Sequence, residues 1–219
     1  MPPSSIPPEQ RPTIASALPT PTYAAGGSWS ITCSARIRAS LAVVVGATLD
    51  TSTYPAWNAF CPSATVDGGF SSAKLPAAVC PPPPGLDPKL AAGTLLTLDA
   101  HLGPGDASSR NQTALCVSCL EQFTADEEGG AGSGRVGVRL AWRTRDGGLM
   151  NRVLRAERVQ EFVEDGDGGV EYACWETFHG LLAPVVKMMV GTSLLWGFGA
   201  WMDGLKEYTE KFASNAAPP

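Results

Sequence analysis

The sequence predicts an α+β fold, in which antiparallel strands come first and one long helix comes last. Strand-like segments occupy much of residues 93–178, and glycine-rich turns separate several of them. From Leu194 to Phe212 the apolar residues instead recur at steps of three and four, which is the spacing of one helix face. Strands joined in succession by short turns form a meander, and a helix that follows them completes an α+β domain.

The composition fits a single globular domain. The chain has 219 residues, which suffice for one sizeable core, and 44% of them are hydrophobic. The formal net charge is -5 and Lys and Arg form no cluster, so we expect no nucleic-acid partner. We also expect a monomer or a weak homodimer. The six cysteines are scattered through a chain of this size, so we expect reduced thiols. No secretory signal is visible, and we expect a cytoplasmic protein.

Two segments are too rich in proline to form regular elements. Residues 1–27 contain few large apolar groups, so we expect a disordered tail there, and a second short tail at 214–219. The stretch at about 62–92 includes four successive prolines, which exclude helix and central strand, so a long surface loop is expected. The predicted domain is therefore residues 28–213, with this loop inserted.

The domain begins with a strand over residues 28–39, in which polar and apolar residues alternate. Residues 39–60 then interrupt the strands. Their apolar residues lie at near-helical spacing, and the step from Tyr54 to Pro55 forces a turn, so one or two short helices are expected.

Five further strands are expected downstream, and one shows the pattern most clearly. In residues 135–144 the side chains of Val136 and Val138 share one face, while Arg139 lies on the other. This pattern is typical of an antiparallel sheet with one face toward water. The five segments are residues 93–102, 113–125, 135–144, 152–164 and 170–178.

The C-terminal helix is expected to begin near Pro184, because proline suits a first helical turn. Its second half is amphipathic, whereas its first half is apolar all round except for Lys187. A helix that is apolar all round lies either in lipid or inside protein. Lys187, several glycines and the unbroken run into the amphipathic half argue against a membrane span.

Two phrases of the sequence are specific enough to compare with known families. The segment after the first strand reads DTSTYPAWNAF, and ETFHGLLA stands at the start of the long helix. Both resemble phrases of the SRPBCC, or START-like, superfamily, which includes polyketide cyclase/dehydratases, pollen-allergen-type carriers and lipid-transfer domains. The resemblance covers about residues 28–213 and departs from the family at the Pro-rich stretch. The residues that match the first phrase are Asp50, Tyr54, Pro55, Trp57, Asn58 and Phe60.

The resemblance implies a helix-grip fold. In this fold a curved antiparallel sheet of six or seven strands wraps around a long C-terminal helix, and two short helices follow the first strand. It also implies a hydrophobic cavity between the sheet and the helix, and such a cavity with a few polar groups is the general form of a small-molecule site. The sequence has no phosphate-binding loop, nucleophile elbow or His-rich cluster, so we expect neither a cofactor nor a metal.

Polar residues on the predicted strands are the strongest candidates for chemistry. Glu176, Arg158, Gln160 and Glu121 each share alternation parity with apolar neighbours, so each is expected to point inward. An inward carboxylate beside an inward arginine can orient a carbonyl group or act as an acid and base, so Glu176 and Arg158 are candidate catalytic residues. The alternative is that a one-residue bulge places such a residue on the wet face.

Other candidates are weighed against purely structural roles. His179, at the start of the long helix, is a candidate general base, and the alternative is an ordinary loop histidine. Tyr54 and Trp57 stand where the resemblance places a cavity mouth, either as a gate or as a structural plug. The remaining candidates for ligand contact are Asn58, Trp142, Met188, Met189, Leu195 and Trp196.

Three functions remain open from the sequence. The first is an enzyme that cyclises, dehydrates or isomerises a hydrophobic polyketide-like intermediate, using the cavity as a template. The second is a carrier of a lipid, quinone or aromatic metabolite. The third is an adaptor that binds a protein through its helix or Pro-rich segments. An inward Glu176 or Arg158 favours the enzyme, and an exposed apolar patch favours the adaptor.

Overall fold

The computed structural model describes residues 6–104, 110–125, 134–147 and 153–216. Within these residues the strands form one antiparallel sheet, in the order β1-β2-β8-β7-β6-β5-β4-β3. The strands are β1 (Thr13–Ala15), β2 (Trp29–Ile37), β3 (Ser63–Gly68), β4 (Leu95–His101), β5 (Arg110–Ala125), β6 (Arg135–Thr144), β7 (Arg155–Glu164) and β8 (Val170–His179).

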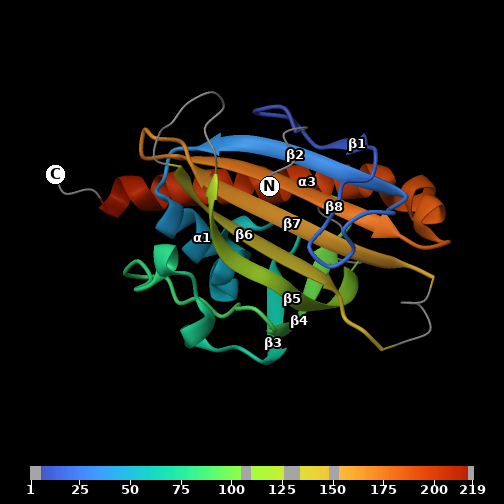
Figure 1. The fold of residues 1–219 in the computed structure, drawn as a ribbon, viewed down its shortest axis with the longest axis horizontal. Coiled ribbons are helices and arrows are strands. Elements are labelled where there is room, and N and C mark those ends of the chain that lie inside the picture. The colour runs from blue at the N-terminus through green and yellow to red at the C-terminus, as the bar shows by residue number, and fades with distance from the viewer. Residues whose placement is uncertain (1–5, 105–109, 126–133, 148–152, 217–219) are drawn as a thin grey trace.

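Helices cover one face of this sheet. α1 (Leu41–Leu49) and α2 (Tyr54–Trp57) follow β2, and α3 (Ala183–Ala216) follows β8. Figure 1 shows α3 running behind the sheet along the long axis of the molecule, while α1 lies below it in this view. The curved sheet therefore wraps around the C-terminal helix, which confirms the predicted α+β helix-grip architecture. The sheet has eight strands in the described residues, against the six or seven expected.

Alternation along the strands places one set of side chains against α3. Ile31 on β2 and Phe178 on β8 belong to the same buried core as Phe198, Trp201 and Leu205 on α3. Those three helix residues follow the predicted steps of three and four, and each is fully buried. The main core is thus the layer between the inner face of the sheet and α3.

Two glycines in α3 allow other segments to approach the helix closely. A Cβ atom at Gly204 would lie 2.0 Å from the carbonyl oxygen of Trp57, and one at Gly197 would lie 2.4 Å from the ring of Phe60. Neither distance is compatible with a side chain. These glycines therefore let α2 and the residues after it pack directly on α3.

Residues 6–24 pack against the rest of the domain, so the expectation of a disordered tail at 1–27 is wrong for its described part, and residues 1–5 lie outside the described residues. β1 pairs with β2, and Gln10 Nε2 donates to Thr32 Oγ1 at 2.7 Å. Further along, Trp175 Nε1 donates to the carbonyl oxygen of Pro19 at 3.0 Å. We call residues 6–24 the N-terminal strap. Its middle forms the edge strand β1, just before which Arg11 pairs with Asp203 of α3, and its two ends lie on the outer face of the sheet.

The outer face of the sheet explains why a segment of this composition is ordered. It carries hydroxyl side chains, and Ser30 Oγ accepts from the amide of Leu18 at 2.9 Å. It also carries a small second core in which Ile6 and Leu18 pack against Val159 and Trp175. The strap therefore gains its order from nearby β2 and from residues of β7 and β8 more than 100 positions away, which its own composition does not reveal.

Glu157 is the buried charge that holds the strap. Its side chain is fully buried on the outer face. The amide of Thr22 donates to Oε2 at 2.9 Å and the hydroxyl of Thr22 to Oε1 at 2.8 Å, while Ser118 Oγ donates to Oε1 at 2.5 Å. A carboxylate is buried at acceptable cost only when it is hydrogen-bonded in this way.

The stretch at 62–92 is more regular than expected. It begins with edge strand β3, whose residues alternate in exposure, and it includes the short 3-10 turns Ser72–Lys74 and Ala77–Val79. Val79, Leu86 and Leu90 are buried in the main core. The expected long surface loop is therefore wrong in part, because the four prolines occupy only the tip of a segment that packs at both ends.

The ends of α3 also differ from expectation. The helix continues to Ala216, so the predicted tail at 214–219 is wrong for residues 214–216, and the rest of that tail lies outside the described residues. Met188 and Met189 in the first half are 81% and 74% exposed. By length and composition this helix could cross a membrane, and a third of its most apolar window is buried in the protein. Its second half packs along the sheet as a core helix.

We predict that Gly204→Ala destabilises the fold. The new methyl group meets the Trp57 carbonyl, and such overpacking costs about 1–3 kcal/mol, which a urea denaturation curve measures. Gly191→Ala is the matched control, since its Cβ would lie 3.7 Å from Ile14 Cδ1. That variant should gain up to about 1 kcal/mol from helix propensity. Equal stability of the two variants would show that α2 does not need this glycine.

We predict that Thr22→Val loosens the strap. The variant keeps the shape of the side chain but removes a hydroxyl donor from buried Glu157, which costs about 1.5–3 kcal/mol of unfolding free energy. Ser16→Ala, at an exposed position of the same strap, should stay within about 0.5 kcal/mol of the wild type. A Thr22→Val protein as stable as the Ser16→Ala control would mean that the strap contributes little.

Candidate functional site

Four polar residues on β7 and β8 point inward and meet in the core. Arg158 lies opposite Glu176, and Gln160 lies opposite Cys174, in the antiparallel register of the two strands. Phe162, on the same face of β7, belongs to the main core, which fixes the direction of this face. We call Arg158, Gln160, Cys174 and Glu176 the inner cluster. The sequence predicts three of its four members.

Arg158 is the charged centre of the inner cluster. Its side chain is only 3% exposed, and its guanidinium carbon lies 4.2 Å from the centre of the Phe198 ring and 4.5 Å from that of Trp201. Burial opposes its charge, but the nearby Cys174, Tyr172 and Glu176 groups raise the pKa of Arg158 above its usual value. It is therefore a permanent buried cation, held between two aromatic rings of α3.

Glu176 is surrounded by protein but keeps partial contact with solvent. Burial raises the pKa of its carboxyl group to about 7, although the positive charge of Arg158 opposes this rise. No salt bridge joins Glu176 to Arg158 among those of the described residues. Near neutral pH this carboxyl group can therefore both give and accept a proton, which is the property that a general acid and base needs.

The core around the inner cluster holds several hydrogen-bond donors that lack acceptors. Among the described buried atoms, Arg158 Nη2, Gln160 Nε2 and Trp201 Nε1 have no partner, and neither has Asn58 Nδ2. The amide oxygens of the two amide side chains are already engaged, since Gln160 Oε1 accepts from Tyr172 and Asn58 Oδ1 accepts from the amide of Cys61. Buried donors without partners are rare in proteins and call for a specific explanation.

Glu121 does not belong to the inner cluster, so its predicted inward direction is wrong. The ladder between β5 and β6 shifts register between Val117 and Cys119, and this bulge reverses the alternation that follows. Arg139 Nη1 donates to Glu121 Oε1 at 2.5 Å, and Arg139 Nε donates to Glu161 Oε1 at 2.7 Å on the outer face. Glu121 is thus part of an outer-face network of paired charges.

His179 is also on the outer face, so it is not the general base of an interior site. β8 continues through His179, and alternation after the inward Phe178 turns the imidazole outward. The ring of Tyr23 in the strap lies 4.7 Å from the imidazole ring. Burial and the charge of Arg155 lower the pKa of His179. Because His179 ends strand β8 and does not lie in a loop, the alternation of that strand sets the direction of its side chain.

The aromatic candidates split into buried and peripheral groups. Tyr54 and Trp142 both meet the ring of Trp201 edge-on, at 5.5 Å and 5.7 Å between ring centres. The hydroxyl of Tyr54 donates to the carbonyl oxygen of Thr48 at 2.8 Å, so this residue plugs the end of the core. Leu195 and Trp196 are partly buried at the edge of the main core.

Met188 and Met189 lie on the outer side of α3, so the prediction that they line the cavity is wrong. The side of the helix that faces the sheet here carries smaller residues, and Ala183 is buried while Val186 packs against the main core. Both sides of this half of the helix are apolar at helical spacing, so the sequence does not indicate which side faces the sheet.

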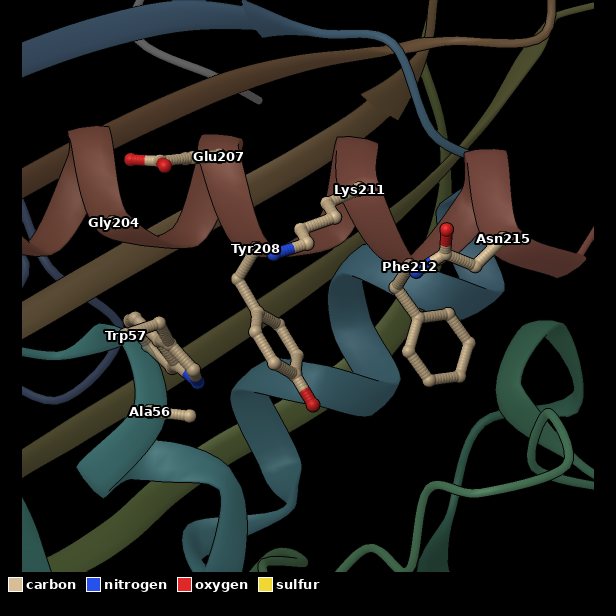
Figure 2. A pocket seen from close by; sticks show the side chains of 8 residues that line it. All are labelled: Ala56, Trp57, Gly204, Glu207, Tyr208, Lys211, Phe212 and Asn215. Atoms are coloured by element: carbon tan, nitrogen blue, oxygen red, sulfur yellow. The ribbon is translucent and has the colours of Figure 1, made fainter.

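A surface pocket of about 350 Å³ lies between α2 and the end of α3. Figure 2 shows the rings of Trp57, Tyr208 and Phe212 along its wall, with Lys211 on the helix side. Trp57 also contacts Trp201 edge-on at 5.2 Å, so these two rings separate the pocket from the inner cluster. Trp57 is therefore both a plug and a pocket wall. Its indole nitrogen donates to Thr53 Oγ1 at 2.9 Å.

Cys174 is the member of the inner cluster that sequence reasoning missed. It shares parity with Glu176, and this parity was the signal that could have found it. Its Sγ accepts a hydrogen bond from Arg158 Nε at 3.3 Å. Among the described residues no group of three or more His, Cys, Asp or Glu side chains is placed to hold a metal ion.

Comparisons of the sequence with known proteins give a distant relative. No protein-family model matches this chain. Oxopyrrolidines biosynthesis cluster protein O of Penicillium oxalicum is 28% identical over 200 residues, which cover 87% of this chain and 90% of that protein.

Solved structures share the fold of this chain at low sequence identity. A hypothetical protein from Helicobacter pylori has a TM-score of 0.54 and 16% identity, covering 81% of this chain and 86% of its own. The Zhui aromatase/cyclase from a Streptomyces species has a TM-score of 0.53 and 8% identity, covering 83% and 93%. Ara h 8.0201 has a TM-score of 0.51 and 13% identity, covering 83% and 97%. This chain therefore shares its helix-grip fold with these three solved structures.

Proposed function

We propose that this protein binds a hydrophobic, carbonyl-bearing small molecule between the sheet and α3, and that it catalyses cyclisation, dehydration or isomerisation of that molecule. The observation that carries the proposal is the Nη2 of Arg158, which has no partner among the described residues although Arg158 lies opposite Glu176 in the register of β7 and β8. A buried cation that does not pair with the carboxyl group opposite it has a donor free to bind an oxygen atom of a ligand.

The donors without acceptors indicate what kind of ligand the site takes. Arg158, Gln160 and Trp201 each offer an N–H group to the core, and the surrounding rings are apolar. A pure hydrocarbon would leave these donors unsatisfied, at a cost of about 1–3 kcal/mol each. A molecule with ketone or enol oxygens on an apolar skeleton satisfies them.

The geometry supports acid and base chemistry at a carbonyl compound. With the ligand oxygen on Arg158, the carboxylate of Glu176 takes a proton from the carbon next to the carbonyl, and the electron pair moves to the oxygen as an enolate. Arg158 stabilises that negative charge. The protonated Glu176 then returns the proton at another carbon or to a departing hydroxyl group. These steps are shared by isomerisation, aldol-type cyclisation and dehydration.

The relative from Penicillium oxalicum supports a role in making a metabolite, since its name places it in a biosynthesis cluster. The fold also suits a carrier of a lipid, quinone or aromatic metabolite, and the exposed Met188 and Met189 would suit an adaptor that binds a protein. The inner cluster favours the enzyme, because a carrier or an adaptor has no need of an unpaired buried cation. We propose a cytoplasmic monomer or weak homodimer without a nucleic-acid partner or membrane span.

Native mass spectrometry of the protein purified from its own host should reveal a bound carbonyl compound. Two probes test the recognition directly: dihydrochalcone carries one ketone, and 1,3-diphenylpropane is the same skeleton without it. We expect the ketone to bind more tightly, and Arg158→Gln to lower its affinity roughly ten- to hundredfold. Arg36→Gln, at a surface ion pair, is the control and should change neither affinity. Equal binding of both probes would contradict recognition by Arg158.

The raised pKa of Glu176 predicts a pH-dependent stability difference. Its pKa is about 7 in the fold. It is about 4.3 in an unfolded chain, so the folded state holds the extra proton between these values and loses stability as pH rises through them. Glu176→Gln should therefore gain melting temperature relative to the wild type between about pH 5 and about pH 8.

The matched control for the pH series is Glu207→Gln, at an exposed carboxyl group on α3. Its melting temperature should differ from that of the wild type by a constant amount across the same pH range. A constant difference for Glu176→Gln as well would show that the Glu176 carboxyl group titrates normally.

A further inference from the structure

Two cysteines face each other inside the core beside Arg158. Cys33 on β2 lies directly opposite Cys174 on β8, and both are free, fully buried thiols. The guanidinium Nε of Arg158 donates to Cys174 Sγ at 3.3 Å, and its Nη2 has no partner among the described residues. This arrangement places one sulfur atom against a buried cation and leaves a second donor of that cation free.

The charge of Arg158 needs an anion nearby. An arginine side chain does not lose its proton in proteins, and a buried charge without a counter-charge is costly. Burial opposes ionisation of Cys174, but a hydrogen bond from Cys33 and the charge of Arg158 outweigh it and lower the pKa of Cys174. By contrast, burial raises the pKa of Cys61 to about 12. Of these two interior thiols, Cys174 is the one with thiolate character, and the thiolate is the nucleophile.

We propose that Cys174 is a nucleophile that adds reversibly to α,β-unsaturated carbonyl compounds bound in the inner cluster. This inference rests on the proposed function, because it needs the cluster to take a carbonyl ligand. Glu176 stands two residues further along the same face of β8, about 6.6 Å away, and it retains contact with solvent. An enone is short, and Arg158 Nε lies 3.3 Å from Cys174 Sγ, so an enone whose carbonyl oxygen accepts a hydrogen bond from Arg158 brings its β-carbon close to Cys174.

The addition step balances with the groups present. The Cys174 thiolate forms a bond to the β-carbon, the carbon–carbon π bond breaks, and its electron pair moves through the conjugated system to the carbonyl oxygen. The resulting enolate oxygen accepts a hydrogen bond from Arg158 Nη2. The protonated carboxyl group of Glu176 then gives its proton to the α-carbon, which leaves a neutral thioether adduct and an ionised Glu176.

Reversal of these steps gives the protein a specific activity. Glu176 removes the α-proton, the enolate reforms the double bond, and the thiolate leaves. While the adduct exists the former double bond is a single bond and rotates freely. The site therefore interconverts the cis and trans isomers of an enone, with no oxidant, reductant or second substrate.

Chalcone, an apolar enone, tests the proposal, with dihydrochalcone as its saturated counterpart that binds but does not react. Cys80 is exposed and Cys116 and Cys119 are half-buried, so all three are replaced by serine in the background protein. Intact-mass spectrometry should show one chalcone added and no dihydrochalcone. Peptide mapping of this background protein should place the adduct on Cys174 and show Cys61 unmodified.

Variants then separate the roles of the neighbours. Cys61→Ser should keep the rate of adduct formation, and Cys174→Ser should abolish the adduct. Arg158→Gln should slow it at least roughly thirtyfold at about pH 7, because even an ordinary thiol with a pKa of about 8.5 is only a few per cent ionised there. Irradiation-prepared cis-chalcone should return to the trans isomer faster with the background protein than with Cys174→Ser.

The outcomes distinguish this inference from the proposed function. If dihydrochalcone binds and depends on Arg158 while chalcone leaves Cys174 unmodified, the covalent step is wrong and carbonyl recognition stands. If chalcone modifies Cys61 in preference to Cys174, the assignment of the nucleophile is wrong. If neither compound binds, carbonyl recognition fails, and the covalent step fails with it.

Discussion

The buried guanidinium of Arg158 is the group on which the interior depends. A permanent cation in an apolar core is tolerated only when its surroundings compensate for lost water. Here the guanidinium group lies over the rings of Phe198 and Trp201, and Cys174 accepts a hydrogen bond from it. Because those rings belong to α3, the charge on the sheet also fixes where the helix lies. Trp201 in turn contacts the rings of Tyr54 and Trp57 edge-on, so the positions of these two residues also depend on Arg158.

Buried charged groups have partners on the outer face of the sheet and are unpaired with each other on the inner face. On the outer face Glu157 is saturated by hydroxyl and amide donors, and Arg139 holds two carboxylates. On the inner face Arg158 and Glu176 stand opposite each other without a salt bridge, although pairing them would satisfy both. The outer arrangement is that of structural polar groups. The inner arrangement leaves the charges of Arg158 and Glu176 unpaired with each other. Unpaired buried charges of this kind are typical of functional sites and not of residues that only support a fold.

Much of the fold follows from the sequence because alternation along strands is a local property. It predicts the strands from 93 onward, and it predicts that Arg158, Gln160 and Glu176 point inward. The same rule fails at Glu121, since a bulge two residues earlier reverses parity and leaves no trace in composition. It also gives no account of β1, whose order comes from hydroxyls on β2. The first half of α3 is ambiguous for another reason, because both of its sides are apolar and only packing decides which is buried.

The N-terminal strap has a consequence for the order of folding. Its partners are far away in sequence: Thr22 bonds to a residue 135 positions later, and Pro19 to one 156 positions later. Contacts of such separation carry the highest loop-closure cost and form slowly. During synthesis the strap leaves the ribosome before β7 and β8, yet part of its binding surface exists only after these two strands have been made and paired. The strap is therefore made well before it can complete its packing.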